Sequence, residues 1–165
     1  MIDSQGKQQQ EITKGGKKMS ADSAAKKQIP AVVGWFTMPP EDPHIKASKC
    51  TACGDVFFPP GGVCRNPRCA KDGAMEVVLL SRRGKLKTYT INHYPPPPPY
   101  HAADPFVPFG VGEVRLQEGI NITGQIATGH EEGLEIGMEM EVVRETLYVD
   151  DEGNDVLVYK FRPVT

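Results

Sequence analysis

Apolar and polar residues alternate along much of the second half of the chain, and this alternation predicts β-strands. It is clearest in residues 86–91 (Leu-Lys-Thr-Tyr-Thr-Ile) and 156–161 (Val-Leu-Val-Tyr-Lys-Phe). A period of two residues is typical of a strand that buries one face. We expect six such strands, at Val77–Ser81, Lys85–His93, Val107–Leu116, Ile120–Thr128, Met138–Val149 and Asp155–Phe161.

Turn-forming residues separate these strands and indicate the fold class. Glycine marks expected turns at Arg83-Gly84, at Glu118-Gly119 and within residues 151–154, Asp-Glu-Gly-Asn. The pattern contains neither a long amphipathic helix nor an alternation of helices and strands. We therefore expect a mainly β fold, and five or six strands of this length suit a small closed barrel such as an OB-fold. Spacing alone does not separate a barrel from a β-sandwich.

All four cysteines lie close together in the sequence, in the array C-x2-C-x10-C-x4-C. Short strands are expected at Ile45–Lys49 and Val56–Phe58, on either side of the first pair. Gly54 tolerates the positive φ that lets backbone amides turn toward the sulfurs. Two such knuckles place four thiolates around one tetrahedral ion and leave no open position. We expect one structural Zn²⁺ per chain, held by Cys50, Cys53, Cys64 and Cys69; a redox or disulfide role and iron are the alternatives.

These features divide the chain into three parts. Residues 1–30 are polar and hold few large apolar side chains. They cannot bury enough surface to offset the entropy of ordering, so we expect a flexible polar tail. Residues 31–75 contain an N-terminal anchor, with the only tryptophan, followed by the zinc ribbon. Residues 76–165 are expected to form the OB-fold barrel.

The composition and the N-terminal sequence indicate the cellular location of the protein. No run of 18 apolar residues exists, so we expect no membrane span. The first residues lack the apolar core of a secretory signal, so we expect a cytoplasmic protein. Residues 14–18, Lys-Gly-Gly-Lys-Lys, fit a translated ribosome-binding site, so Met19 is a second candidate start beside Met1.

The net charge of −2 hides an uneven distribution. Residues 46–87 carry nine lysines and arginines against three acids, whereas residues 88–165 carry four against thirteen. A basic stretch beside an acidic one fits one face that binds an anionic ligand and another that stays solvated. It also fits two halves that partly neutralise each other.

Two classes of function suit a zinc ribbon joined to an OB-like barrel. One is an accessory subunit that docks on an enzyme and contacts an anionic cofactor such as coenzyme A. The other is nucleic-acid binding, with Tyr89 or Phe57 stacking on bases. The acidic barrel would repel a nucleic-acid strand, so this class is the weaker alternative. Its phosphate-facing candidates are Lys46, Lys49, Arg65, Arg68, Lys71, Arg82, Arg83, Lys85 and Lys87.

The sequence supplies no recognisable catalytic set. If all four cysteines bind zinc, none remains as a nucleophile, and neither a nucleophile elbow nor a phosphate loop is visible. We therefore expect no catalytic residue in this chain. The histidines are dispersed and are expected to be structural or solvated: His44, His93, His101 and His130.

Several segments resemble a family that pairs a rubredoxin-like zinc ribbon with a C-terminal OB-fold and is found beside thiolases and related acyl-CoA enzymes. The resemblance covers roughly residues 34–163. It rests on residues 50–54 (CTACG), 57–60 (FFPP), 81–93 (SRRGKLKTYTINH), 108–114 (PFGVGEV), 124–126 (GQI), 136–138 (IGM) and 161–163 (FRP). Within the family, residues 35–44 and 64–67 resemble the small subunit of 2-benzoylsuccinyl-CoA thiolase, from anaerobic toluene degradation.

The resemblance implies a thiolase-fold partner in a hetero-oligomer. That partner would cleave a β-keto acyl-CoA with free coenzyme A, yielding benzoyl-CoA and succinyl-CoA in the subgroup, and would carry the nucleophilic cysteine. Archaeal acetoacetyl-CoA thiolase and synthase scaffolds and steroid side-chain aldolase partners share the two domains, so other acyl-CoA substrates stay open. Arg82 and Arg83 are candidates to border the coenzyme A phosphates or an acidic partner patch; the alternative is two solvated turn residues.

Five consecutive prolines, residues 95–99, predict a stiff polyproline II segment. Such a segment cannot sit inside a sheet, so we expect a loop that projects between two barrel strands. It would present nearby aromatic residues to the partner at low entropic cost. The alternative is a rigid connection that packs on its own barrel. The interface candidates are Tyr94, Tyr100, Phe106 and Phe109.

Overall fold

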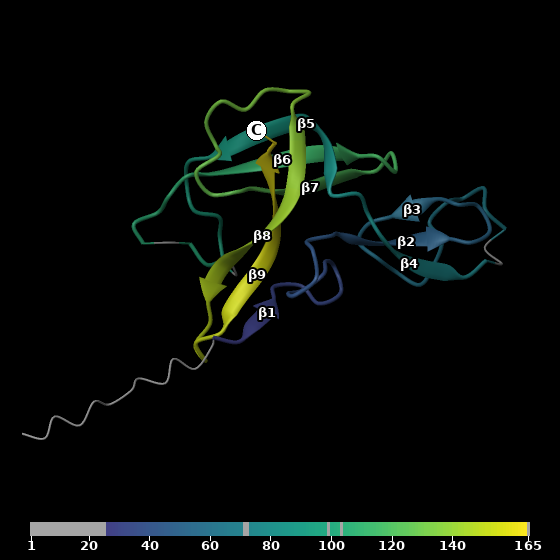
Figure 1. The fold of residues 1–165 in the computed structure, drawn as a ribbon, viewed down its shortest axis with the longest axis horizontal. Coiled ribbons are helices and arrows are strands. Elements are labelled where there is room, and N and C mark those ends of the chain that lie inside the picture. Colours follow the sequence, from purple (N-terminus) through teal and green to yellow (C-terminus); the bar gives the residue numbers. More distant parts are fainter. Residues whose placement is uncertain (1–25, 71–72, 99, 103, 165) are drawn as a thin grey trace, which may run out of the picture.

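The structure is a computed structural model that describes residues 26–70, 73–98, 100–102 and 104–164. Every element in these ranges is a β-strand, which confirms the expected all-β class. Nine strands form two sheets, one of six strands and one of three (Figure 1). The described ranges contain no helix long and apolar enough to cross a membrane.

The larger sheet closes into the expected OB-type barrel. Its strands are hydrogen-bonded in the order β5-β6-β7-β9-β8, and β8 returns to pair with β5. All neighbours are antiparallel except β7 and β9, which run parallel. Closure gives every barrel strand a hydrogen-bonded neighbour on both sides over at least part of its length. The strands are β5 (Arg83–Asn92), β6 (Phe109–Leu116), β7 (Asn121–Ile126), β8 (Glu139–Val149) and β9 (Asp155–Pro163).

The smaller sheet carries the cysteines and forms the ribbon, which lies to one side of the barrel (Figure 1). Its order is β3-β2-β4, with β2 at Lys46–Cys50, β3 at Val56–Phe57 and β4 at Met75–Leu79. β4 is the strand expected at Val77–Ser81 as part of the barrel. The structure corrects that expectation, because β4 pairs with β2 along its whole length.

The first described strand was not expected from the sequence. β1, at Gln28–Pro30, runs parallel to β9, with Ile29 opposite Val156. The backbone amide of Ala31 continues this pairing with a 2.7 Å bond to the Leu157 carbonyl. Most of the predicted polar tail lies outside the described residues, but its last three residues extend the barrel sheet.

One apolar core runs through the anchor, the ribbon and the barrel. Phe36 and Ile45 are buried in the same cluster as the barrel residue Phe161. Aromatic rings continue this cluster across the joint: Phe58 of the ribbon lies 5.0 Å from Trp35 and 6.1 Å from Tyr159, centroid to centroid. Because the two sheets share these contacts, the ribbon has a fixed position on the barrel.

Two of the three expected turns are present, and the third is not. Gly119 and Gly153 turn the chain with φ of 79° and 83°, at the β6–β7 and β8–β9 connections. Arg83-Gly84 was wrong as a turn, because both residues belong to β5. Gly84 pairs with Leu116 and Met140, and a Cβ there would clash with the Arg115 carbonyl oxygen. Glycine is needed at this point for close strand packing, not for a turn.

Candidate metal centre and binding surfaces

The fold brings the four cysteine sulfurs into one cluster. All four Sγ atoms lie within 4.8 Å of one another, and the separations are 3.8 Å for Cys50–Cys69 and 3.7 Å for Cys53–Cys64. These separations are too long for disulfides, whose S–S bond is about 2.05 Å. Four sulfurs at about 2.3 Å from a tetrahedral zinc ion lie about 3.8 Å apart. The donor set and its spacing therefore fit a four-cysteine metal site.

Local backbone bonds shape the first knuckle. The amide of Gly54 donates to the Cys50 carbonyl at 2.8 Å, and Gly54 has φ of 79°. The amide of Cys50 donates to the Asp55 carbonyl at 2.9 Å, which closes the β2–β3 hairpin. The positive φ expected at Gly54 is confirmed, and it is the conformation glycine adopts without steric cost.

Asn66 organises the wider second knuckle, a role that its position in the sequence did not signal. Its side-chain oxygen accepts the Arg68 amide at 2.8 Å, and its carbonyl accepts the Cys69 amide at 3.3 Å. Its side-chain Nδ2 donates to Asp55 at 2.6 Å, so the two knuckles are linked. This network positions the second pair of cysteines against the first.

The cluster favours a bound cation on electrostatic grounds. Backbone amides, that of Cys53 above all, lower the pKa of Cys50 to about 7. The amide of Asp55 lowers the pKa of Cys53, but burial and the surrounding thiols outweigh it and raise that pKa to about 12. Burial also raises the pKa of Cys64. Four thiolates this close repel one another, and a divalent cation removes that repulsion while requiring the deprotonated ligands.

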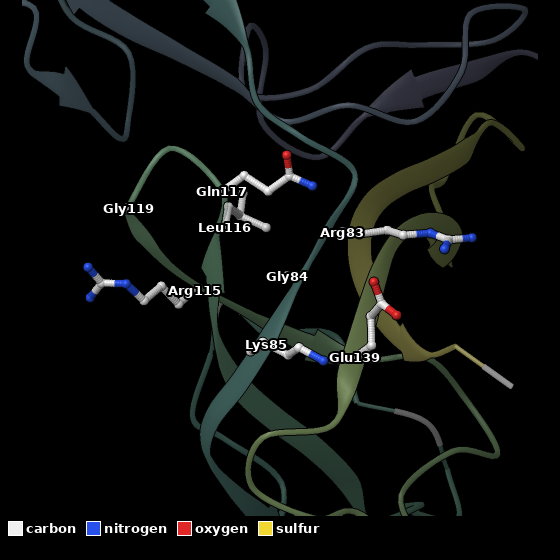
Figure 2. A pocket seen from close by; sticks show the side chains of 8 residues that line it. All are labelled: Arg83, Gly84, Lys85, Arg115, Leu116, Gln117, Gly119 and Glu139. Carbon is white, nitrogen blue, oxygen red and sulfur yellow. The ribbon is translucent and has the colours of Figure 1, made fainter.

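The two arginine candidates lie in different surroundings. Arg82 is half-buried, with Nη1 4.0 Å from a carboxylate oxygen of Asp42. Its Nε is buried and has no hydrogen-bond partner among the described residues. Arg83 is exposed on β5, beside a surface depression of about 430 Å³ (Figure 2). Of the two, Arg83 thus has the more exposed side chain.

The depression brings together residues that the sequence analysis did not connect. Lys85 and Arg115 line it from neighbouring strands, β5 and β6, together with Arg83. Arg115 was not singled out from the sequence, because only the strand register shows that it lies opposite Lys85.

Most of the aromatic residues of the proline segment pack against the barrel. Tyr100 stacks on Phe109 with ring centroids 5.4 Å apart, and Phe106 meets Phe109 edge-on at 6.3 Å. His101 stacks on Tyr148 of β8 at 4.0 Å. Tyr94 differs, since 75% of its surface is exposed. Of the four interface candidates, Tyr94 alone stands clear of the barrel.

The two base-stacking candidates of the nucleic-acid alternative are engaged within the protein. The guanidinium of Arg65 lies 5.0 Å above the ring of Phe57 and covers one face of it. The hydroxyl of Tyr89 donates to the Leu134 carbonyl at 3.0 Å, although the ring is 39% exposed. Lys71 lies outside the described residues. Among the described residues, these two candidates therefore do not form a row of open aromatic faces for stacked bases.

Comparison with known protein families accounts for both sheets. Residues 39–76 match the ChsH2 rubredoxin-like zinc ribbon domain, and residues 77–145 match the ChsH2 C-terminal OB-fold domain. The sequence matches therefore give the same two parts as the structure, a zinc ribbon followed by an OB-fold barrel.

Individual relatives span most of the chain. A DUF35 domain-containing scaffold protein of Methanothermobacter thermautotrophicus is 33% identical over 132 residues, 76% of this chain and 91% of the relative. The benzoylsuccinyl-CoA thiolase subunit BbsA of Thauera aromatica is 30% identical over 122 residues, covering 74% and 78%. In the solved Ltp2-ChsH2(DUF35) aldolase, one chain shares the fold, with a TM-score of 0.56, 24% identity and coverage of 74% and 86%.

Proposed function

Since the chain belongs to the ChsH2 family of zinc-ribbon and OB-fold proteins, we propose that it is a non-catalytic accessory subunit of an enzyme complex that acts on acyl-CoA thioesters. One observation carries this proposal: the chain has four cysteines, and all four are gathered in a single cluster with the spacing of a closed metal site. Relatives described as a scaffold protein and as a thiolase subunit support the same role.

The four cysteines hold one structural Zn²⁺ per chain. Zinc suits four thiolates in tetrahedral geometry, and such sites have no open position for substrate or water. When bound, the ion cross-links the two knuckles and supplies no acid, base or nucleophile. The chain's own residues, with Asn66 between the knuckles, then keep the ribbon in one shape against the barrel.

The partner is a thiolase-fold chain, and the complex cleaves a β-keto acyl-CoA with coenzyme A. Thiolytic cleavage needs a cysteine to carry the acyl group, a base to deprotonate it and donors for the oxyanion. The cysteines of this chain are committed to the metal cluster, so the partner supplies the nucleophile. The similarity to a benzoylsuccinyl-CoA thiolase subunit makes 2-benzoylsuccinyl-CoA the first substrate to test.

Tyr94 and the prolines that follow it form the part of the interface that reaches the partner. The rings of Tyr100, Phe106 and Phe109, which follow this segment in the chain, pack on one another. A preordered segment loses little conformational entropy when it binds. Arg83 faces the coenzyme A phosphates, whereas Arg82 stays beside Asp42 at the joint.

The direct test is to express this chain and the thiolase-family chain of its own genome, separately and together. We expect a stable hetero-oligomer by size-exclusion chromatography. We also expect cleavage of 2-benzoylsuccinyl-CoA, or of another β-keto acyl-CoA, only by the mixture. Full turnover by the thiolase chain alone would contradict the accessory role. Turnover by this chain alone would contradict the absence of a catalytic site.

A further inference from the structure

β4 forms one edge of the ribbon sheet, and its second side is unpaired among the described residues. The sheet order is β3-β2-β4, so β2 is its one neighbour among the described strands (Figure 1). An edge strand exposes a row of backbone donors and acceptors that can pair with another chain, and native proteins commonly protect it with a charge, a proline or a covering loop. The residues on the open side of β4 therefore indicate whether this edge is protected or used.

The ladder with β2 shows which backbone groups of β4 point to the open side. The Leu80 amide donates to the Ile45 carbonyl at 2.9 Å, and the Thr51 amide donates to the Ala74 carbonyl at 3.0 Å. Hydrogen-bonded and non-hydrogen-bonded pairs alternate in an antiparallel ladder, so the even-numbered residues of β4 bond to β2. The backbone groups that point away from β2 belong to the odd-numbered residues. These are Met75, Val77 and Leu79.

The same three residues place apolar side chains on one face of the sheet. Val77 is 68% exposed and Leu79 is 52% exposed, while Met75 is half-buried. Neither a charged residue nor a proline stands among them. The open side of β4 thus combines free backbone groups with exposed apolar side chains, which favours pairing with a further strand.

We propose that this edge is a self-association surface, on which β4 of a second copy pairs antiparallel to β4 with Val77 opposite Val77. The three outward-facing residues are spaced symmetrically about Val77, so this register also pairs Met75 with Leu79 of the second copy on both sides of a two-fold axis. Each pair exchanges both backbone hydrogen bonds, which satisfies every outward amide and carbonyl of the strand. A shift by two residues would leave one of the three opposite a position outside β4.

The charges of the ribbon fit this register. In it, Glu76 lies opposite Val78 of the second copy, and Lys49 faces Glu76 within its own ribbon. Lys46 pairs with Leu79 from β2, so a whole strand separates it from the joint between the copies. Like charges that face each other destabilise an antiparallel pair, and this register places none opposite each other across the two β4 strands.

The direction of β4 keeps the two barrels apart. Leu80, which follows β4, is buried in the core shared with the barrel, so this end of the strand lies at the barrel. Met75, at the other end, lies opposite Cys50 of the cysteine cluster. In an antiparallel pair the second barrel therefore lies beyond the cysteine end of the first ribbon, and the two barrels are at opposite ends of the dimer.

This dimer does not depend on the proposed function, and the zinc-loaded full chain without any partner is used to test it. Sedimentation equilibrium measures its mass at increasing protein concentration. We expect a weak dimer, half formed near about 100 µM, because two five-residue strands bury less surface than a stable interface. A chain that stays monomeric at about 1 mM would overturn the proposal.

A charge swap at one position tests the register. Val77→Lys and Val77→Glu should each weaken the dimer by about tenfold or more, because each places like charges opposite each other. Their equimolar mixture should dimerise again, because the register centred on Val77 sets the two opposite charges together. Val149→Lys, at an exposed valine of β8, is the matched control and should dimerise as the wild type does. Unchanged dimers in both Val77 variants, or no recovery in their mixture, would overturn the proposal.

Amide hydrogen exchange followed by NMR tests the edge in the wild-type protein and so does not depend on how the variants fold. The amides of Met75, Val77 and Leu79 should exchange about twofold more slowly, or slower still, at about 1 mM than at about 50 µM, because bonded amides exchange only when the pairing opens. The amides of Glu132 and Gly133, in an exposed barrel loop, should keep their rates. Protection that appears only when a thiolase-family chain is added would overturn the second copy as the occupant of this edge.

Discussion

The ribbon and the barrel reach a fixed shape by different means. The barrel buries large apolar side chains from every strand around one centre, including Leu86, Ile122, Met140 and Phe161. The ribbon has strands of five, two and five residues, and the small residues Ala47, Ser48 and Cys50 are among its buried ones. A sheet this small cannot bury enough surface to fold alone, so we expect the ribbon to depend on a bound metal and the barrel on its core.

The ribbon and the barrel are held together by a shared core and by hydrogen bonds, and this joint bears on function. Phe36, Ile45 and Leu80 lie outside the barrel strands but are buried in its core cluster. Arg144 of β8 donates 2.8 Å and 2.6 Å bonds to the carbonyls of Thr37 and Glu41. The ribbon is therefore anchored on the barrel through a shared core, an arrangement suited to presenting fixed surfaces to a partner.

The largest effect is expected from breaking the metal site. Cys53→Ser should abolish zinc binding and unfold the ribbon, because structural zinc contributes on the order of 10 kcal/mol to such folds. The barrel, which contains no cysteine, should keep its strands. Inductively coupled plasma mass spectrometry measures the zinc content, and heteronuclear NMR separates the amides of β2–β4 from those of β5–β9.

Thr51→Ser is the matched control, since it lies in the same knuckle and keeps a hydroxyl toward the Ala74 carbonyl. It should hold one zinc per chain. A Cys53→Ser protein that retains one zinc would contradict the assignment of Cys53 as a ligand. Loss of the barrel signals together with the ribbon signals would contradict the expectation that the barrel keeps its fold without the metal.

The second largest effect, a loss in the free energy of unfolding, is expected from a change in the barrel core. Phe161→Ala removes a fully buried ring and should lower the free energy of unfolding by about 3–5 kcal/mol. Phe57→Ala in the ribbon removes a half-buried ring covered by Arg65 and should cost about 1–2 kcal/mol. Urea unfolding of the zinc-loaded variants compares the two. Equal losses would mean that the ribbon relies on packing as much as the barrel does.

Much of this contrast was predictable from the sequence, because it depends on local patterns. Alternation located the barrel strands to within about two residues at each end, as in β8, expected at Met138–Val149 and found at Glu139–Val149. The spacing of the cysteines predicted the cluster, since each knuckle is built within a few residues.

The features that the sequence did not reveal depend on contacts between distant segments. β1 has only three residues and is defined by its pairing with β9. The sequence pattern predicts β4 as a barrel strand, and only its register with β2 places it in the ribbon. Arg115 becomes a site residue only because it lies opposite Lys85. Neither periodicity nor motif spacing encodes such pairings.

The barrel also contains an ion pair, between Glu145 and Lys160, whose contribution to stability should depend on pH. Glu145 of β8 accepts bonds from Lys160 at 2.9 Å and from the amide and hydroxyl of Thr128 at 3.2 and 2.9 Å. Burial alone would raise the pKa of Glu145, but these hydrogen bonds and the charge of Lys160 outweigh it and lower that pKa. Glu145→Gln should cost about 1–3 kcal/mol at pH 7, because Lys160 is left buried without its counter-charge.

The lowered pKa determines how this loss depends on pH. A carboxyl with a lowered folded-state pKa stabilises the fold above its unfolded pKa, and this contribution disappears as the pH falls through the folded value. The difference between the wild-type protein and Glu145→Gln in urea unfolding should therefore shrink below about pH 4.5. Exposed Glu132→Gln is the control and should show no such trend. A difference that stays constant with pH would rule out the ion pair as its cause.

The smallest effect on stability is expected at the proposed interface. Tyr94→Ala removes an exposed ring and should change the free energy of unfolding by less than about 0.5 kcal/mol. It should weaken assembly with the partner, measured by analytical ultracentrifugation of the mixture. Tyr100→Ala removes a ring stacked on Phe109 and should instead lower stability. Unchanged assembly in Tyr94→Ala would exclude this tyrosine from the interface.

We expect this chain to supply surfaces and no chemistry to the complex, and the fate of the acyl group tests this expectation most directly. The mixture of this chain and its thiolase partner is quenched during turnover of the β-keto acyl-CoA, and both chains are weighed by intact mass spectrometry. We predict an acyl adduct on the partner alone, while all four cysteines of this chain stay unmodified in the metal cluster. An acyl adduct on any cysteine of this chain would contradict it.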